Sequence, residues 1–267
     1  MTDPLRRLRE WLRQRKAARI AVTAGQWADA ESCLSCLGHL SSAEKSRLRQ
    51  LALQFLAEKQ MSGARGLELN LAIQLSIALQ ACLLVLNLGL DWYQGWLGIV
   101  VYPGDFVIPR RQMDEYGILH EFDDAVLGEA WQGGPVLLSW HGERQGPDGV
   151  NVVIHEFAHQ LDMHNGIPDG LPPLHPGMSR RAWVDAFAPA YADFCRRVAQ
   201  SEQDEVETAL DPYASESPAE FFAVMSEAFF ETPQLLCAEY PAVYAQLKLF
   251  YRQDLLTASV SMHDYPL

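Results

Sequence analysis

Residues 151–162, with the sequence N-V-V-I-H-E-F-A-H-Q-L-D, constrain the fold more than any other part of the chain. The segment contains no glycine or proline, and an apolar run precedes its first histidine, so we expect an α-helix packed into the body of the protein. His159 follows His155 by four positions, which places both imidazoles on one face of the helix, one turn apart. This spacing is typical of two nitrogen ligands of one tetrahedral zinc ion.

Glu156 directly follows the first of these histidines. From there its carboxylate can reach a metal-bound water rather than the metal, and so act as a general base. The alternative is an ordinary amphipathic helix with two surface histidines. The apolar residues on both sides of the motif argue against this alternative, because buried imidazoles and carboxylates need partners and a metal ion supplies one. The motif therefore predicts a zinc-dependent hydrolase.

A catalytic zinc ion commonly has three protein ligands and one open position. Asp162, three positions after His159, could coordinate, but its place fits a helix-terminal group or a residue that orients a ligand better. Four downstream glutamates share one stripe of a helix that turns by about 100° per residue: Glu216, Glu220, Glu227 and Glu231. The stripe fits a solvated acidic face as well, and residues 217–220 also fit a helix N-cap in which Glu220 is purely structural. Spacing alone leaves the third ligand open.

Helical patterns dominate the first 90 residues. Leucines and a tryptophan among arginines predict a basic amphipathic helix over residues 4–19, which suits an anionic partner or membrane surface, or plain docking onto the rest of the fold. Further helices are expected at residues 27–37, 42–59 and 69–88. The second of these begins with a capping box, Ser41 and Glu44. The third is uncharged, but five polar side chains in residues 69–90 favour a core helix over a membrane span.

The sequence period changes after residue 96. Two β-branched runs at residues 97–102 and 106–108 flank the turn sequence Pro-Gly-Asp, and together they predict a hairpin. The acidic segment 114–129 is expected to be irregular. Residues 135–140 predict another strand, and as a hypothesis its part from 136 to 140 is an exposed edge that holds an extended peptide. A core strand that touches no substrate is equally compatible with this sequence.

The motif helix is followed by a long loop over residues 165–177, of the kind that often borders an active site. Three further helices are expected at residues 179–199, 218–231 and 241–256.

The chain has a net charge of −13 and a pI near 5.0, so its surface repels nucleic-acid phosphates and we expect no direct nucleic-acid binding. The charge is uneven, because residues 1–20 carry +5 and the remainder −18. Five cysteines, an odd number, are typical of a reducing compartment. The charged start does not resemble a secretory signal peptide. We therefore expect a cytoplasmic protein without a membrane span.

The motif H-E-F-A-H-Q-L-D, the D-P-Y-A-x-E-S-P-A-E-F-F motif and a terminal F-Y-R-Q-D resemble the Mlc titration factor A family of bacterial zinc peptidases. That family is gluzincin-like, and its core is similar to the anthrax lethal factor peptidase domain. The match covers most of the chain from about Pro103 onward and is weak over the first 60 residues. The resemblance implies that Glu220 is the third zinc ligand and that Tyr213 assists at the transition state. His155, Glu156 and His159 also match their family positions.

The resemblance implies an α+β fold, a mainly helical zincin-like metallopeptidase with a small β-sheet beside the H-E-x-x-H helix. We expect one domain over residues 1–267, with a basic helix (1–20), a helical layer (21–95) and a part that holds the sheet and the catalytic helices (96–267). One Zn²⁺ per chain would serve hydrolysis of a peptide or protein substrate, with aminopeptidase-type activity. The rival hypothesis, also drawn from the family, is a regulatory protein that sequesters a glucose-responsive transcriptional repressor such as Mlc.

Overall fold

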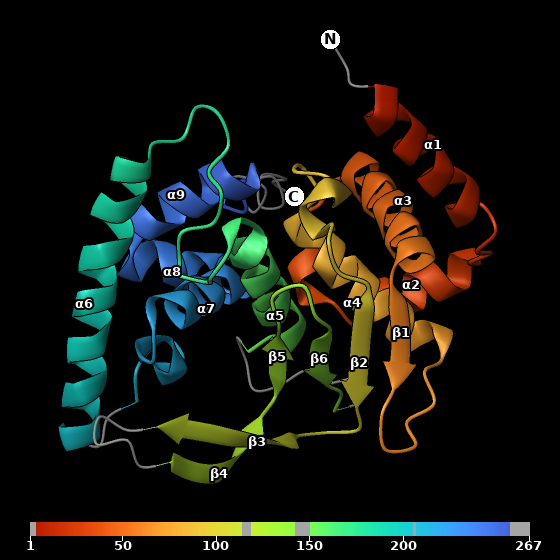
Figure 1. The fold of residues 1–267 in the computed structure, drawn as a ribbon. Helices are drawn as coiled ribbons and strands as arrows, with labels where there is room; N and C mark the ends of the chain where they lie inside the picture. Colours follow the sequence, from red (N-terminus) through yellow and green to blue (C-terminus); the bar gives the residue numbers. More distant parts are fainter. Residues whose placement is uncertain (1–3, 114–118, 142–149, 205–206, 257–267) are drawn as a thin grey trace, which may run out of the picture.

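The computed structural model describes residues 4–113, 119–141, 150–204 and 207–256. The helices before the sheet are α1 (Pro4–Ala17), α2 (Ala24–Ser32), α3 (Ser42–Glu58) and α4 (Leu71–Leu84). Those after it are α5 (Val152–Asp162), α6 (Arg180–Asp204), α7 (Pro218–Glu231), α8 (Pro233–Glu239) and α9 (Pro241–Tyr251). Helix α5 lies in the middle of the molecule, with α1–α4 on one side and α6–α9 on the other (Figure 1). The mainly helical α+β fold is confirmed.

Four short strands form a mixed sheet beside α5 in the order β1 (Gln60–Gly63), β2 (Gly98–Tyr102), β6 (Val136–Ser139) and β5 (Gly128–Ala130). The first three run parallel, and β5 runs antiparallel to β6. Every residue of β6 is buried, whereas β5 lies at the end of the strand order and contacts α5. The strand edge beside the motif helix therefore belongs to β5. The hypothesis that residues 136–140 form that edge is wrong, because β2 and β5 flank β6.

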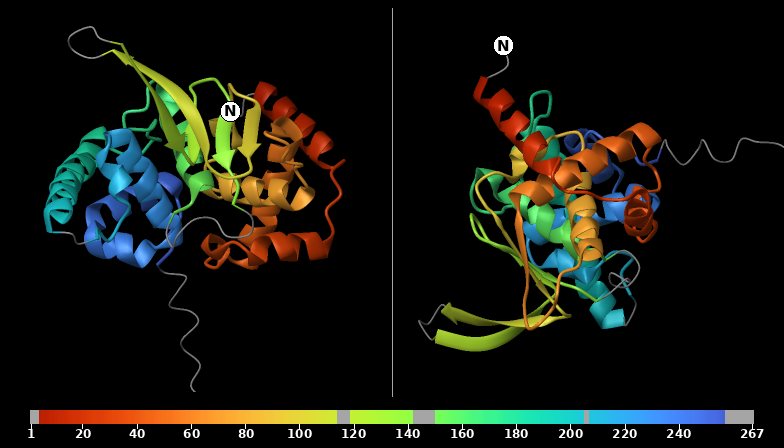
Figure 2. Two further views of the ribbon diagram at one scale, coloured as in Figure 1. Left: turned by 90° about the horizontal axis from the view of Figure 1, so that it is seen from below. Right: turned by 90° about the vertical axis from the view of Figure 1, so that its right-hand side faces the viewer.

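A second, two-stranded sheet pairs β3 (Phe106–Met113) with β4 (Leu119–Val126) and projects away from the helices (Figure 2). The predicted hairpin across residues 97–108 is wrong, since β2 pairs in parallel with β1 and β6 instead. The Pro-Gly-Asp turn redirects the chain from one sheet into the other. The segment 114–129 was expected to be irregular, and this is also wrong for its described part, which contains all of β4 and the first two residues of β5.

The core anchors α5 by its apolar side. Phe157 is fully buried, and its ring lies against those of Phe55, Tyr93 and Trp96, with centroids 5.2 to 5.7 Å apart. Edge-on aromatic contacts of this kind add stabilisation beyond the burial of apolar area. With Phe157 held in the core, the opposite face of α5 is fixed toward the C-terminal helices.

Most predicted helices are present. The capping box of Ser41 and Glu44 begins α3, and α7 has the predicted bounds. Helix α4 is almost entirely buried, and no helix in the described parts of the chain is long and apolar enough to cross a bilayer. Sequence reasoning missed β1, which interrupts the N-terminal helices, and α8, which follows α7 almost without a break. Both are short, and their apolar residues give too few periods to recognise.

Candidate metal centre

The N-cap residue Asn151 fixes the start of α5, since its Oδ1 accepts a hydrogen bond from the backbone N–H of Ile154 at 3.0 Å. One turn apart on this helix, His155 and His159 point in the same direction, with ring centroids 4.8 Å apart. Their Nε2 atoms lie 3.2 Å from each other. The arrangement expected from the four-residue spacing is present.

Glu220 reaches the histidines from α7. Ser217 is the N-cap of this helix, and its hydroxyl accepts from the backbone N–H of Glu220 at 3.2 Å, while Pro218 occupies the first turn. The carboxylate of Glu220 does not close a capping box on Ser217. Its Oε2 lies 2.9 Å from Nε2 of His155 and 3.1 Å from Nε2 of His159.

These three atoms suit a metal ion. In a tetrahedral site with bonds of about 2.1 Å, the ligand atoms lie about 3.4 Å apart, close to the triangle of 2.9, 3.1 and 3.2 Å seen here. Nδ1 of His155 lies 2.7 Å from Oε1 of Glu227. A proton on Nδ1 donates to that carboxylate and leaves the lone pair of Nε2 directed at the triangle. In the described parts of the chain, His155, His159 and Glu220 form the one group with this potential.

The charges around the triangle favour a cation. Burial raises the pKa of Glu220, but the hydrogen bonds to the two histidines outweigh it and lower that pKa to about 2. Burial lowers the pKa of His155, whereas the carboxylates of Glu227 and Glu220 raise it well above its usual value. Glu156, Glu220 and Glu227 thus lie close to the two imidazoles. A divalent ion would offset the negative charge of these carboxylates.

Glu156 lies beside the triangle, packed under the sheet edge. Only 4% of the residue is exposed, and burial raises the pKa of its carboxyl to about 8. A Cβ atom on Gly128 of β5 would lie only 2.5 Å from Oε1 of Glu156. The carboxylate therefore packs directly against this glycine, and a larger residue there would clash with it. Among the described residues, Oε2 of Glu156 is buried without a hydrogen-bond partner. Such a group has an unused proton-accepting position next to the histidines.

A cleft of about 860 Å³ opens over these side chains, between β5, α5 and the start of α7. Tyr213 lies at its rim in the short helix η4 (Pro212–Ser215), which Asp211 caps by accepting from the N–H of Tyr213 at 2.9 Å. The tyrosine is half exposed, and its ring centroid lies 5.9 Å from that of His155. All five residues singled out in the sequence therefore meet in one cleft.

A family model for the glucose-regulated metallo-peptidase M90 matches residues 8–252, nearly the whole chain. The chain belongs to this family. It is 37% identical over 226 residues to the Mlc titration factor A of Klebsiella pneumoniae subsp. pneumoniae, with 82% of each chain covered. It is 34% identical over 247 residues to that of Salmonella arizonae, which covers 90% of this chain and 95% of the relative. A third relative of the same name, from Escherichia fergusonii, is 35% identical over 234 residues, 85% of each chain.

M90 membership confirms the family resemblance that the motifs indicated. The family model matches from residue 8, so the similarity begins closer to the N-terminus than the motifs suggested. A metallopeptidase family implies a metal ion, and the triangle on α5 and α7 is where this chain offers ligand atoms for one.

Asp162, the other candidate ligand, lies outside the triangle. It is fully buried, and its Oδ2 accepts from the backbone N–H of Gly170 at 2.8 Å, so it fastens the long loop to the end of α5. Gly170 has φ of +76°, and a Cβ there would lie 2.4 Å from the carbonyl oxygen of Pro218 in α7. The loop thereby sets the distance between the helix that carries the histidines and the helix that carries Glu220.

Two residues that contact the histidine and glutamate of the motif, Glu227 and Gly128, were not singled out in the sequence. Glu227 appeared in the acidic stripe, and its position seven residues after Glu220 places it two turns further along α7, facing His155. Its Oε2 also accepts from the backbone N–H of Asn151 at 2.5 Å. Gly128, which makes room for Glu156, has no signal in the sequence because the pairing of β5 depends on β6.

Proposed function

We propose that the chain is a zinc-dependent peptidase in which His155, His159 and Glu220 bind the ion. The observation that carries this proposal is the triangle of their ligand atoms, 2.9 to 3.2 Å on a side, in a cleft of about 860 Å³. Two imidazoles and one carboxylate form a typical donor set of catalytic zinc sites, which keep a fourth position open. A zinc ion there supplies a Lewis acid that polarises a peptide carbonyl and lowers the pKa of water.

The protein side chains would handle the protons and the developing charge. Glu156 takes a proton from the attacking water at its carboxylate and passes it to the nitrogen of the leaving amine. Burial raises the pKa of this carboxyl, which makes its carboxylate a stronger proton acceptor. The phenol of Tyr213, at the rim beside His155, donates a hydrogen bond to the carbonyl oxygen as it becomes negative.

The edge of β5 that pairs with no strand in the described parts of the chain would hold the substrate backbone. Ser139 donates to the carbonyl of Leu127, and the N–H of Trp131 faces Pro135, so residues 127 and 131 turn toward β6. Because strand residues alternate, the backbone groups of Gly128 and Ala130 face away from β6 toward the cleft. An extended peptide can add to this edge by main-chain hydrogen bonds. Ala130→Pro should raise KM without loss of bound metal, and an unchanged KM would remove β5 from this role.

Metal analysis by inductively coupled plasma spectrometry tests the ligand set most directly. The wild-type protein, purified without added metal, should carry about one zinc ion per chain. Glu220→Ala should lose most of it, while Glu216→Ala, an exposed glutamate of the same sequence stripe, should retain it. Zinc retained by Glu220→Ala would contradict the ligand set, and another metal in the wild type would contradict the choice of zinc. Cleavage of peptides with free and with acetylated N-termini then distinguishes an aminopeptidase from an endopeptidase.

A second function is suggested by the relatives, each of which is named Mlc titration factor A. We propose that this chain also sequesters a transcriptional repressor of the Mlc type and so links to the control of glucose uptake. The alternative, in which such binding is the main role and peptide cleavage is secondary, is tested with His159→Ala. If binding is independent of the metal, this variant should still retain the repressor in size-exclusion chromatography while it no longer cleaves peptides. Absence of complex with the wild-type protein would contradict the proposal.

A further inference from the structure

Helix α1 is attached to the rest of the fold by polar contacts. The guanidinium of Arg13 donates to Glu58, at the end of α3, and to Asp91, in both cases at 2.7 Å. Only 10% of the Arg13 side chain is exposed, and Ala17, one turn further along the same face, is also buried. An arginine with two carboxylate partners therefore faces inward, where a helix that only covers its neighbours would place apolar side chains.

The apolar side chains of α1 face outward instead. Leu8, Trp11 and Leu12 are 52%, 49% and 44% exposed. Their spacing of three and four positions forms one stripe, which at about 100° per residue lies roughly opposite the direction of Arg13 and Ala17. Figure 1 shows α1 at the edge of the molecule, on the outer side of α3. Docking onto the rest of the fold, one of the explanations that the sequence left open, therefore does not account for this stripe.

Cationic side chains border the stripe. Arg7, Arg9, Arg15 and Lys16 are all exposed. The guanidinium of Arg15 lies over the Trp11 ring, 4.8 Å from its centroid, so the two side chains form one surface. A partner for this surface must offer apolar area and negative charge together.

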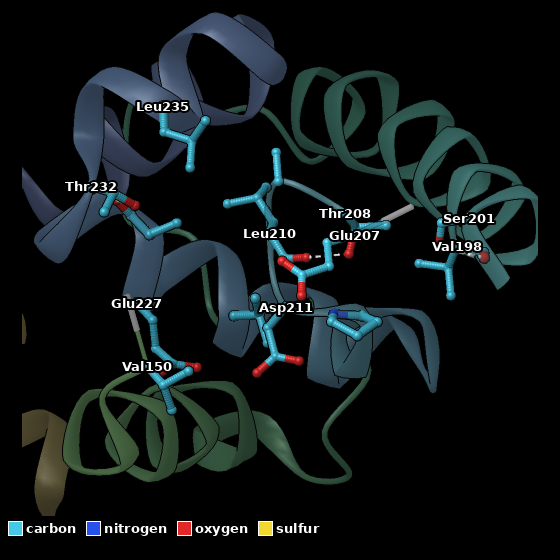
Figure 3. Close-up of a pocket in the computed structure, with 14 residues that line it drawn as sticks. Val150, Val198, Ser201, Glu207, Thr208, Leu210, Asp211, Glu227, Thr232 and Leu235 are labelled. Carbon is cyan, nitrogen blue, oxygen red and sulfur yellow. Dashed lines mark hydrogen bonds between the residues drawn. The ribbon is translucent and has the colours of Figure 1, made fainter. Parts of the chain in front are cut away.

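Much of the negative charge of the molecule lies on its other side. Residues 1–20 carry a net charge of +5 and the remainder −18. Glu207, Asp211 and Glu227 line a cavity of about 510 Å³ between α6, α7 and α8 (Figure 3), and further glutamates line the catalytic cleft beside it. These helices lie on the opposite side of α5 from α1 (Figure 1). This separation of charge turns α1 toward an anionic surface and the cleft away from it.

Two protein partners fit this surface less well than a lipid bilayer. A symmetric dimer would place one α1 against the other and bring two basic surfaces together. An acidic groove on another protein would have to match each cation separately. A bilayer satisfies the cations without a fixed geometry, because its phosphates lie at the level of basic and indole groups and its acyl chains lie beneath them.

We propose that α1 binds the surface of an anionic phospholipid bilayer and lies in the plane of that surface. Leu8, Trp11 and Leu12 face the acyl chains, and Arg15 and Lys16 contact the lipid phosphates. The catalytic cleft, on the other side of the molecule, stays accessible to soluble peptides.

Vesicle binding tests the proposal on the intact protein. In sedimentation assays, partitioning onto vesicles of phosphatidylcholine with an equal share of phosphatidylglycerol should be at least about tenfold stronger than onto phosphatidylcholine alone. Partitioning should weaken between about 0.05 and 0.5 M salt, because the attraction between exposed charges is screened. Wild-type protein that does not bind the anionic vesicles, or that binds both kinds equally, overturns the proposal.

Matched pairs of exposed apolar side chains locate the binding surface. Leu8→Gln with Leu12→Gln should weaken partitioning onto the anionic vesicles by at least about tenfold. Val184→Gln with Leu249→Gln is the control, because these residues are 44% and 52% exposed, like Leu12 and Leu8, but lie on α6 and α9. The control should bind like wild type. An equal loss in both variants, or a loss in neither, overturns the proposal.

Charge variants test the lipid phosphates separately. Arg15→Gln with Lys16→Gln should reduce the preference for anionic over neutral vesicles by about tenfold, and an unchanged preference overturns the proposal. Because the substituted side chains are exposed, far-UV circular dichroism and urea unfolding of these variants should match wild type.

Size-exclusion chromatography without lipid tests the other occupants. If the wild type is a dimer and the Leu8, Leu12 double variant a monomer, the stripe is an interface between two copies. If that variant instead loses its complex with a repressor of the Mlc type, the stripe binds an acidic protein. Either result, found in place of vesicle binding, overturns the proposal.

Discussion

Helices α4 and α5 pack against each other in the middle of the fold, and both begin at an asparagine N-cap. Asn70 accepts from the backbone N–H of Ile73 at 2.9 Å, as Asn151 does from Ile154 at 3.0 Å. The residues that the two helices bury are very different. Apart from Ser76 and Gln80, the buried residues of α4 are apolar. Buried polar residues of α5 are more numerous: Glu156, His159, Gln160 and Asp162.

The difference in buried residues shows that this fold buries more polar side chains on α5 than on α4. A buried polar group destabilises unless it is paired, and α5 carries two buried oxygen atoms without a partner among the described residues, one on Glu156 at the cleft and one on Asp162 at the end of the helix. In α4 the one buried amide, Gln80, is satisfied by Ser76 and by Asn151 at the start of α5. Helix α4 therefore serves stability, whereas α5 retains groups whose use is chemical.

Glu156→Gln is expected to have the largest effect. The amide keeps the shape of the side chain but cannot take a proton from water, so kcat should fall by about 10²- to 10⁴-fold. Bound metal should remain, and stability near neutral pH should change little, because burial raises the pKa of this carboxyl to about 8 and the amide that replaces it is neutral as well. Stopped peptide-cleavage assays, metal analysis and urea unfolding measure the three quantities. In α4, Leu79→Ala should do the reverse, with a loss of about 2–5 kcal/mol in stability and normal kcat per folded molecule. Normal turnover by Glu156→Gln would refute its role as the base.

The two N-caps offer a matched pair. Asn70→Ala removes a cap and should cost about 1 kcal/mol of unfolding free energy. Asn151→Ala removes a cap and also the amide that donates to Gln80 at 2.7 Å and to Glu231 at 2.6 Å, so about 2–4 kcal/mol is expected. Chemical denaturation of both variants at one pH gives the comparison. Equal losses would mean that the polar contacts of Asn151 contribute nothing beyond the cap.

Sequence periodicity could predict the local parts of this contrast. The shared face of His155 and His159 follows from helix geometry, and Ser217 with Pro218 predicts where α7 begins. The direction in which the Glu220 carboxylate turns depends on how α7 packs against α5, which spacing does not contain. Only the resemblance to a known family selected it from its acidic stripe.

The strands were the weakest part of the prediction for the same reason. Residues 97–102 were correctly identified as a strand, but their partner β1 lies before α4 in the chain and pairs in parallel across it. A turn signal such as that at residues 103–105 favours a partner that follows directly, and here it instead leads into β3. Pairing of β5 with β6, which brings Gly128 over Glu156, likewise arises from tertiary contacts.

The contribution of Asp162 in α5 to the free energy of unfolding should depend on pH, whereas that of the buried Ser76 in α4 should not. Burial raises the pKa of this carboxyl from 3.8 to about 6, although the N–H of Gly170 lowers it. The folded state thus binds the proton more tightly, so the contribution of Asp162 to stability is complete below pH 4 and is lost as pH rises through 6. The stability of Asp162→Asn relative to wild type should therefore rise by up to about 3 kcal/mol between pH 4 and 7 and then stay level. Ser76→Ala in α4 should give a constant offset. Urea unfolding at several pH values measures these differences. If the difference in unfolding free energy between Asp162→Asn and wild type does not change with pH, the shifted pKa is contradicted.

Glu227→Gln is expected to have the smallest effect. It tests whether the contact between Glu227 and His155 orients the histidine for metal binding. The glutamate accepts from Nδ1 of His155 at 2.7 Å and from the backbone of Asn151 at 2.5 Å. An amide has one acceptor oxygen, so one of these donors loses its partner and His155 is no longer held in a single tautomer. Zinc affinity, measured by competition with a chelator, should fall by about 10- to 100-fold while the fold is retained. Glu231→Gln is the matched control, because this glutamate contacts Asn151 but not His155. If the control weakens zinc binding as much as Glu227→Gln, the polar groups at the start of α5 act on stability in the same way as those of α4, and the contact with His155 has no separate part in metal binding.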